Sequence, residues 1–277
     1  MTTMEQRMAI CQEMFEGLSW DEQCEMIAKL GYQGIEVAPF TLGGAPTELP
    51  ADERRRMKKV ASQHGLTIIG LHWLLAKTTG YHLTTADEAT RTKTAEYLRG
   101  LVHLCGDLGG TIMVLGSPLQ RNIEDGMTRE QAFENACGIL TSITSDLEAR
   151  HVTLCIEPLG RKETNFCNTC AEAVEMIERI GHPNLALHQD IKAMLDEPTG
   201  LVELIHQFAR YTKHFHLNDS NLLGPGMGET DFKPVVKALK ETDYSGWLSL
   251  EVFRYEPSSE EVARLSLAHM KDVFEQV

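Results

Sequence analysis

Four side chains suited to metal binding and proton transfer end consecutive β-like runs in the second half of the chain. Glu157 and Asp190 end two such runs, and His216 and Glu251 lie at the ends of the next two. Because the carboxyl ends of neighbouring parallel strands meet at one edge of a sheet, we expect these side chains to converge. The spacing therefore predicts one polar site built from three carboxylates and one imidazole.

Three carboxylates in one small volume would repel one another and shift each other's pKa values. A divalent cation is the simplest neutralising group. Three oxygen donors and one imidazole suit Mn²⁺ best, with Mg²⁺, Co²⁺ and Zn²⁺ as alternatives, and open positions remain for substrate oxygens. The alternative interpretation is that each carboxylate only caps the helix that follows its strand.

These residues belong to a regular series of short β-like runs bounded by Gly, Pro, Asn or Asp. The runs are Met8–Phe15, Gly34–Pro39, Leu66–Trp73, Thr111–Ser117, Val152–Glu157, Leu185–Asp190, His214–Asp219 and Leu248–Phe253. Side chains alternate along a strand, so His188 shares a face with Asp190, and His214 shares one with His216. His188 is then expected to lie deeper in the barrel than Asp190, and it is interpreted as a core histidine with satisfied hydrogen bonds.

Helical segments alternate with the strands, and several end at a glycine. They are Asp21–Leu30, Asp52–His64, Ala86–Leu108, Ala171–Ile180, Thr199–Phe208, Phe232–Glu241 and Glu260–Phe274. Eight alternating β/α units predict an α/β fold, a closed (β/α)8 TIM barrel, in a single domain over residues 1–277. A doubly wound open sheet is the alternative, but no G-x-G-x-x-G motif follows the first strand.

Composition restricts the partners. The formal net charge of −14 disfavours nucleic acid or an anionic membrane surface as the main partner. No run of about 18 apolar residues predicts a membrane span. The 7 cysteines are scattered, which is typical of reduced thiols in a cytoplasmic protein.

Three motifs resemble one known family, the xylose isomerase-like sugar phosphate isomerases and epimerases, and within it the ketose 3-epimerases acting on tagatose or psicose. The resemblance covers nearly the whole chain. The motifs are Ile156-Glu157-Pro-Leu-Gly-Arg161-Lys-Glu163-Thr-Asn-Phe, His214-Phe-His216 and Leu250-Glu251-Val-Phe.

The resemblance implies that Glu157, Asp190, His216 and Glu251 bind the metal. It also implies that Glu157 and Glu251 form an acid/base pair, one on each side of the substrate carbon, in an isomerase or epimerase that works through an enediolate. Glu163 matches a residue that contacts the first of these glutamates. The implied partner is a small sugar, and relatives are often dimers or tetramers.

Two positions depart from the ketose 3-epimerase pattern. Ala193 stands where those enzymes have a histidine three residues after the strand-six aspartate, and Leu222 stands where they have an arginine. Both absent groups help to hold substrate oxygens in the family. Lys192 and Arg254 are the candidates to replace them, and the substrate or the reaction is expected to differ from free-ketose epimerisation.

Further polar residues near the strand ends are expected to contact substrate. A histidine beside an aromatic side chain suits a sugar ring, an arginine suits a carboxylate or phosphate, and amides suit hydroxyl groups. The candidates are His72, Trp73, Arg121, Asn218, Asp219 and Asn221. The glycine-rich segment that follows, residues 224–228, is interpreted as a loop that closes over a small polar substrate.

Three alternative functions share parts of this residue pattern. His216-Leu-Asn218-Asp219-Ser220 matches the strand-seven motif of zinc-dependent AP endonucleases, but the histidines that would complete three metal sites are missing, so DNA repair is not expected. A dehydratase or lyase acting on a keto-inositol or a 3-keto-glycoside would use similar residues. A non-catalytic sugar-binding protein on the same scaffold would explain Ala193 and Leu222.

Overall fold

A closed barrel of eight parallel strands forms the centre of the protein in a computed structural model that describes residues 7–277. Each strand pairs with the next in chain order, and β1 pairs with β8, for example Met8 with Leu248. The strands are β1 (Met8–Cys11), β2 (Gly34–Val37), β3 (Thr67–Leu71), β4 (Ile112–Leu115), β5 (Thr153–Ile156), β6 (Leu185–Asp190), β7 (Thr212–Leu217) and β8 (Leu248–Leu250). The predicted (β/α)8 barrel is confirmed; the first six residues of the predicted domain lie outside the described part.

Most strands end earlier than predicted. β1 stops at Cys11 and continues as the 3-10 helix Gln12–Phe15, and β8 stops at Leu250. Glu157 and Glu251 therefore each lie one residue past a strand, where the backbone leaves the barrel ladder. This places both carboxylates at the mouth of the barrel, where TIM-barrel enzymes have their active sites.

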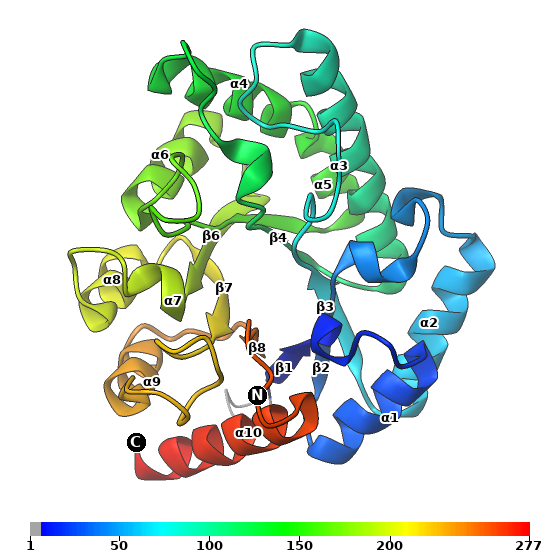
Figure 1. Cartoon of the computed structure of the whole chain (residues 1–277), viewed down its shortest axis with the longest axis vertical. Helices are drawn as coiled ribbons and strands as arrows, with labels where there is room; N and C mark the ends of the chain where they lie inside the picture. Colours follow the sequence, from blue (N-terminus) through cyan, green and yellow to red (C-terminus); the bar gives the residue numbers. More distant parts are fainter. Residues whose placement is uncertain (1–6) are drawn as a thin grey trace.

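Helices surround the barrel and follow one another around it in chain order (Figure 1). They are α1 (Trp20–Leu30), α2 (Ala51–Gln63), α3 (Glu88–Leu108), α4 (Arg129–Thr141), α5 (Thr144–Arg150), α6 (Cys170–Ile180), α7 (Ile191–Met194), α8 (Leu201–Phe208), α9 (Phe232–Glu241) and α10 (Ser259–Gln276). The predictions identified seven of these but missed α4 and α5, between β4 and β5, and the short helix α7 after β6. The available signal was the capping box in which Thr128 and Gln131 bond each other's backbone at the start of α4.

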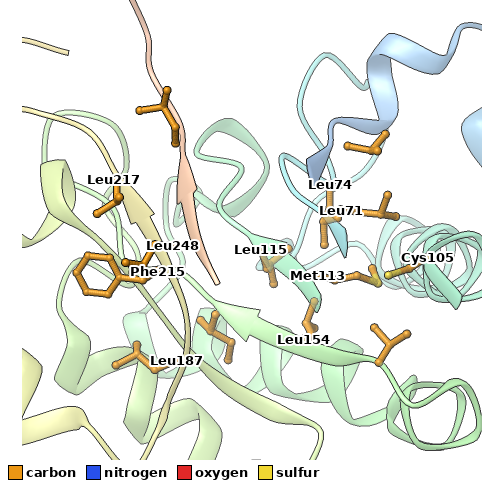
Figure 2. Close-up of a cluster of buried hydrophobic side chains, with 14 of the residues drawn as sticks. Leu71, Leu74, Cys105, Met113, Leu115, Leu154, Leu187, Phe215, Leu217 and Leu248 are labelled. Atoms are coloured by element: carbon orange, nitrogen blue, oxygen red, sulfur yellow. The ribbon is translucent and has the colours of Figure 1, made fainter. Parts of the chain in front are cut away.

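The main core lies between the outer face of the barrel and the helices. Figure 2 shows side chains of several strands, such as Leu115, Leu154 and Phe215, in this layer, with Cys105 of α3 packed near Met113. Inside the barrel, a small apolar cluster lies on β4, β5 and β6: Ile112, Val114, Cys155 and Ala186. Within residues 7–277, no helix has the length and apolar character needed to cross a membrane.

Candidate active site

Glu157 follows β5 and is almost fully buried at the barrel mouth. Its carboxylate occupies space that Gly116, just after β4, leaves free: a Cβ on residue 116 would lie 1.5 Å from Glu157 Oε2. No hydrogen bond from residues 7–277 reaches the Glu157 side chain, in contrast to the other acidic groups of the site. Glu157 is therefore the acidic group with the fewest constraints on its carboxylate.

Asp190, at the end of β6, is held on both sides. Its Oδ1 accepts a hydrogen bond from Ala193 N at 2.9 Å, and its Oδ2 accepts one from Asn218 Nδ2 at 2.5 Å. The aspartate thus caps the short helix α7, as the alternative interpretation anticipated. Capping and metal binding are compatible here because each carboxylate oxygen retains a free lone pair.

Glu251, just after β8, is anchored through Oε1. The indole Nε1 of Trp73 donates to this oxygen at 2.5 Å, and His72 Nδ1 lies 3.2 Å from it. His72 Nε2 is in turn 2.9 Å from Glu13 Oε2. The strand-three pair His72 and Trp73 therefore orients a carboxylate of the site, a role that the prediction of direct sugar contact did not include.

A buried carboxylate on β2 organises the histidines. Glu36 Oε2 lies 3.0 Å from His214 Nε2 and 3.1 Å from His216 Nε2, and all three residues are fully buried. An ionised carboxylate can only accept, so both Nε2 atoms donate. Nδ1 of His216 is then the ring nitrogen that faces the site. Glu36 lies within the predicted run Gly34–Pro39, but nothing in the sequence indicated this contact.

The two glutamates at the mouth have opposite proton affinities. Burial, followed by repulsion from Glu251 and Asp190, raises the pKa of Glu157 to about 8. Burial acts in the same direction on Glu251, but the neighbouring His216 and His72 outweigh it and hold the pKa of Glu251 well below its usual range. Near neutral pH, one carboxyl therefore keeps a proton while the other is ionised.

The donor set suits a divalent metal. Ligand atoms of Glu157, Asp190, His216 and also His188 lie within 4.8 Å of one another. His216 Nδ1 lies 3.2 Å from Glu251 Oε2 yet forms no hydrogen bond with any described residue. Buried carboxylates beside an unpartnered imidazole nitrogen are the kind of ligand set that a divalent cation binds.

The prediction that His188 is a core histidine with satisfied hydrogen bonds is wrong. It is fully buried, and neither of its ring nitrogens has a hydrogen-bond partner in the described part of the chain. Burial, with nearby His216 and His214, holds the pKa of His188 well below its usual value, so the ring is neutral. The alternation rule had placed His188 on the inward face, but its lack of partners became visible only in the structure.

Lys192, the candidate to replace the absent histidine, lies at the mouth. Its Nζ is 2.8 Å from Glu163 Oε1 and 4.1 Å from the centre of the Phe253 ring. Burial opposes its charge, but Asp190 and Glu163 outweigh that effect and raise the pKa of Lys192. Glu163 therefore pairs with Lys192, and within residues 7–277 it makes no hydrogen bond to Glu157, the contact that the resemblance implied.

Arg121 is buried and does not present its guanidinium to the mouth. Its Nε donates to Ser117 O at 3.1 Å and its Nη1 to Glu157 O at 2.7 Å, and Nη2 bonds Leu115 O. The predicted contact with a substrate carboxylate or phosphate is not supported, because main-chain carbonyls at and just after the ends of β4 and β5 take these donors. Arg121 instead supports the backbone that carries Glu157.

Three further residues that were predicted to contact substrate, Asn218 and Asn221 after β7 and Arg254 after β8, form bonds or ion pairs with other parts of the protein. The amide of Asn218 uses both ends, accepting from Lys192 N and donating to Asp190. Asn221 bonds Met227 O and Leu223 N, and Arg254 is half-exposed and lies 3.3 Å from Glu256. Asn218 and Asn221 therefore help to hold the backbone around the site, while the predicted substrate contact of the half-exposed Arg254 stays a prediction.

The glycine-rich segment after β7 is firmly packed. The Asp219 carboxylate accepts from the main-chain N–H groups of Ser220, Gly228 and Thr230. A Cβ on Gly228 would lie 2.4 Å from Asp219 Oδ1. The glycines therefore permit close packing, which does not support the prediction of a loop that closes over substrate.

These pKa shifts predict a pH dependence of the metal-free protein. The folded chain holds a proton on Glu157 between its ordinary pKa of 4.5 and about 8, whereas the unfolded chain has released it, so stability falls as pH rises through this window. The pKa of His216 is raised well above 6.5 because Glu251 and Glu36 outweigh burial, which gives the same sign. The lowered pKa values of His188 and His214 have the opposite sign, but only below pH 6.5, where the unfolded imidazoles bind protons. Thermal melts should show a Tm at pH 8.5 lower than at pH 5.5 by several degrees, about 2–4 °C for each kcal/mol. An equal or higher Tm at pH 8.5 would contradict these shifts.

Known proteins resemble this chain in sequence and in three-dimensional structure. An L-ribulose 3-epimerase of Mesorhizobium japonicum is 30% identical over 186 residues, which are 66% of this chain and 61% of that protein. The chain thus matches under two thirds of that relative's length. A D-psicose 3-epimerase crystallised in the presence of D-fructose superimposes with a TM-score of 0.85 at 21% identity, covering 96% of this chain and 99% of its own.

A second solved structure with this fold is an epimerase of a different sugar. The 3-keto-D-glucoside 4-epimerase of Escherichia coli superimposes with a TM-score of 0.83 at 18% identity, over 96% of this chain and 99% of its own. At such identities the two structures support the fold alone. The family model described as xylose isomerase-like TIM barrel matches residues 24–273. With that match over most of its length, this chain belongs to the xylose isomerase-like TIM-barrel family.

Proposed function

We propose that residues 1–277 form a single-domain, divalent-metal-dependent epimerase or isomerase of a ketose or keto-sugar. The observation that carries this proposal is the convergence of the site's side chains. Ligand atoms of Glu157, Asp190 and His216 lie within 4.8 Å of one another, and Glu251 Oε2 lies 3.2 Å from Nδ1 of the same His216. Two carboxylates in one site can serve as an acid/base pair for a single substrate carbon.

Each glutamate has an environment that fits its role. Glu251 is ionised and oriented by Trp73 and His72, so it can accept the proton from the carbon next to a substrate carbonyl. No described residue donates a hydrogen bond to the Glu157 carboxylate, so this group is free to take up a proton and to exchange it with the enediolate. Return to the opposite face inverts the carbon, and return to the adjacent carbon isomerises the sugar.

Glu157, Asp190, His216 and Glu251 would hold the metal, for which Mn²⁺ is our first choice. When bound, such an ion supplies positive charge that stabilises the negative oxygens of an enediolate. The protein contributes orientation. Asn218 and Ala193 hold Asp190, and Glu36 fixes the tautomer of His216.

A cyclic keto-sugar is the second candidate substrate, for an epimerase or for a lyase. The half-buried rings of Trp73 and Phe253 lie 6.2 Å apart at an angle of 30°, and the Phe40 ring lies 6.0 Å from Trp73. Such a group of aromatic rings suits the flat face of a sugar ring. The Lys192–Glu163 pair lies beside Phe253, and Lys192 is next to Ala193, which stands where a free-ketose epimerase has its histidine.

Incubation of the Mn²⁺-loaded protein with ketoses and 3-keto-glycosides in D₂O tests these proposals. We expect deuterium to enter the substrate at the carbon next to the carbonyl, followed by NMR. An alkene or a cleaved glycosidic bond would move the assignment to a lyase. Tight sugar binding without any deuterium uptake would contradict catalysis and support the sugar-binding alternative.

A further inference from the structure

His188 is the histidine of the barrel interior without a protein partner. His214 and His216 both bond Glu36, whereas both ring nitrogens of His188 lack a partner within residues 7–277. An unpaired buried polar group destabilises the folded state. An imidazole at this position, where a leucine would pack without that cost, suggests a ligand that the amino-acid chain does not supply.

The position of His188 indicates which ligand this is. It precedes Asp190 by two residues on β6 and pairs in register with His214 on β7, while Asp190 pairs with His216. The ring centres of His188 and His216 are 4.1 Å apart, at an angle of 73°. His188 therefore lies directly against the metal site, on the barrel side of it.

Its ligand atoms are close enough to take part. One ring nitrogen of His188 lies within 4.8 Å of the ligand atoms of Glu157, Asp190 and His216. Ligands about 2.0–2.2 Å from one ion are separated by at most about 4.4 Å. The four side chains thus approach the spacing of a common coordination sphere, and small side-chain adjustments close the difference.

We propose that His188 is itself a ligand of the metal, which gives this centre two imidazoles together with the carboxylates of Glu157, Asp190 and Glu251. This inference rests on the proposed metal-dependent function and adds a ligand to it. A second imidazole changes the preference of the site, because imidazole favours Co²⁺, Ni²⁺ and Zn²⁺, whereas an all-oxygen set favours Mg²⁺ and Mn²⁺.

NMR of the Co²⁺-loaded protein in H₂O counts the imidazole ligands directly. Each coordinating histidine with a protonated second nitrogen gives a strongly shifted, exchangeable ring N–H signal. We expect two such signals in the wild-type protein, and one in His188→Leu. The matched control, His103→Gln, changes a half-exposed imidazole on α3 and should keep both signals.

Calorimetric titration of the same proteins measures affinity without activity. We expect His188→Leu to raise the Kd for Co²⁺ by more than about 100-fold, since loss of an outer partner alone costs about 10–100-fold. The Kd for Mg²⁺ should rise less. A melt of the metal-free variant verifies that it folds.

The outcomes of these experiments distinguish the proposed metal centre from the proposed role of His188 as one of its ligands. A single shifted N–H in the wild-type protein, with Co²⁺ bound, would overturn the role of His188 and leave the metal centre intact. That signal count needs no variant, so a His188→Leu protein that fails to fold does not affect it. Failure of the wild-type protein to bind Co²⁺ or Mn²⁺ would overturn the metal centre and the role of His188 together.

Discussion

Glu251→Gln is expected to lower the rate of proton exchange into the substrate by at least about 100-fold, within the range of about 10²–10⁴ for loss of a general base. The amide keeps an oxygen that can accept from Trp73, so the fold of the mouth should persist. It has no basic oxygen with which to accept a proton from carbon. Deuterium uptake measured by NMR at saturating metal checks this prediction.

The matched control is Glu256→Gln, which changes an exposed glutamate paired with Arg254 five residues further along the chain. Its exchange rate should equal that of the wild type within about twofold. If Glu251→Gln, shown by titration to hold metal, still exchanged within tenfold of the wild-type rate, Glu251 would not be the base.

Gly116→Ala is expected to cause a comparable loss although it adds one methyl group. A Cβ at this position would lie 1.5 Å from Glu157 Oε2 and 2.7 Å from its carboxyl carbon, so the carboxyl group must move. Glu157 would then lose its position for both metal binding and proton transfer. We expect the exchange rate to fall by more than about 100-fold, because misplacement of a reacting group by about 1 Å already costs about that much.

Gly138→Ala is the control for this change. Gly138 lies on α4, and an added Cβ there would have no neighbour within 4 Å in the described structure. This variant should keep full activity and be slightly more stable, since alanine favours helix over glycine by up to about 1 kcal/mol. Normal exchange in Gly116→Ala would show that Glu157 does not need its observed position.

The sequence was sufficient for the architecture. Alternation along each strand placed His188 and Asp190 on one face, and glycine-terminated helices between strands indicated the barrel, which the structure confirms. Helices α4 and α5 were missed because the segment between β4 and β5 was not interpreted. Both kinds of signal are local, so a single sequence can show them.

Side-chain partners were predicted less well because they depend on contacts between distant segments. The bond from His214 to Glu36 joins residues 178 positions apart. An arginine after β4 is equally compatible with a phosphate site and with the three main-chain carbonyls that Arg121 bonds. The space that Gly116 leaves for Glu157 is likewise a property of two packed strands and not of either segment alone.

The central claim is that Glu157 and Glu251 move a proton at a carbon next to a carbonyl with the help of a metal that the site holds. Its most direct test is deuterium uptake from D₂O, by the wild-type protein, into the most reactive sugar of the panel. Metal-stripped protein should show almost no uptake, and added Mn²⁺ or Co²⁺ should restore it. Uptake at the same rate in stripped and reloaded protein would contradict the claim.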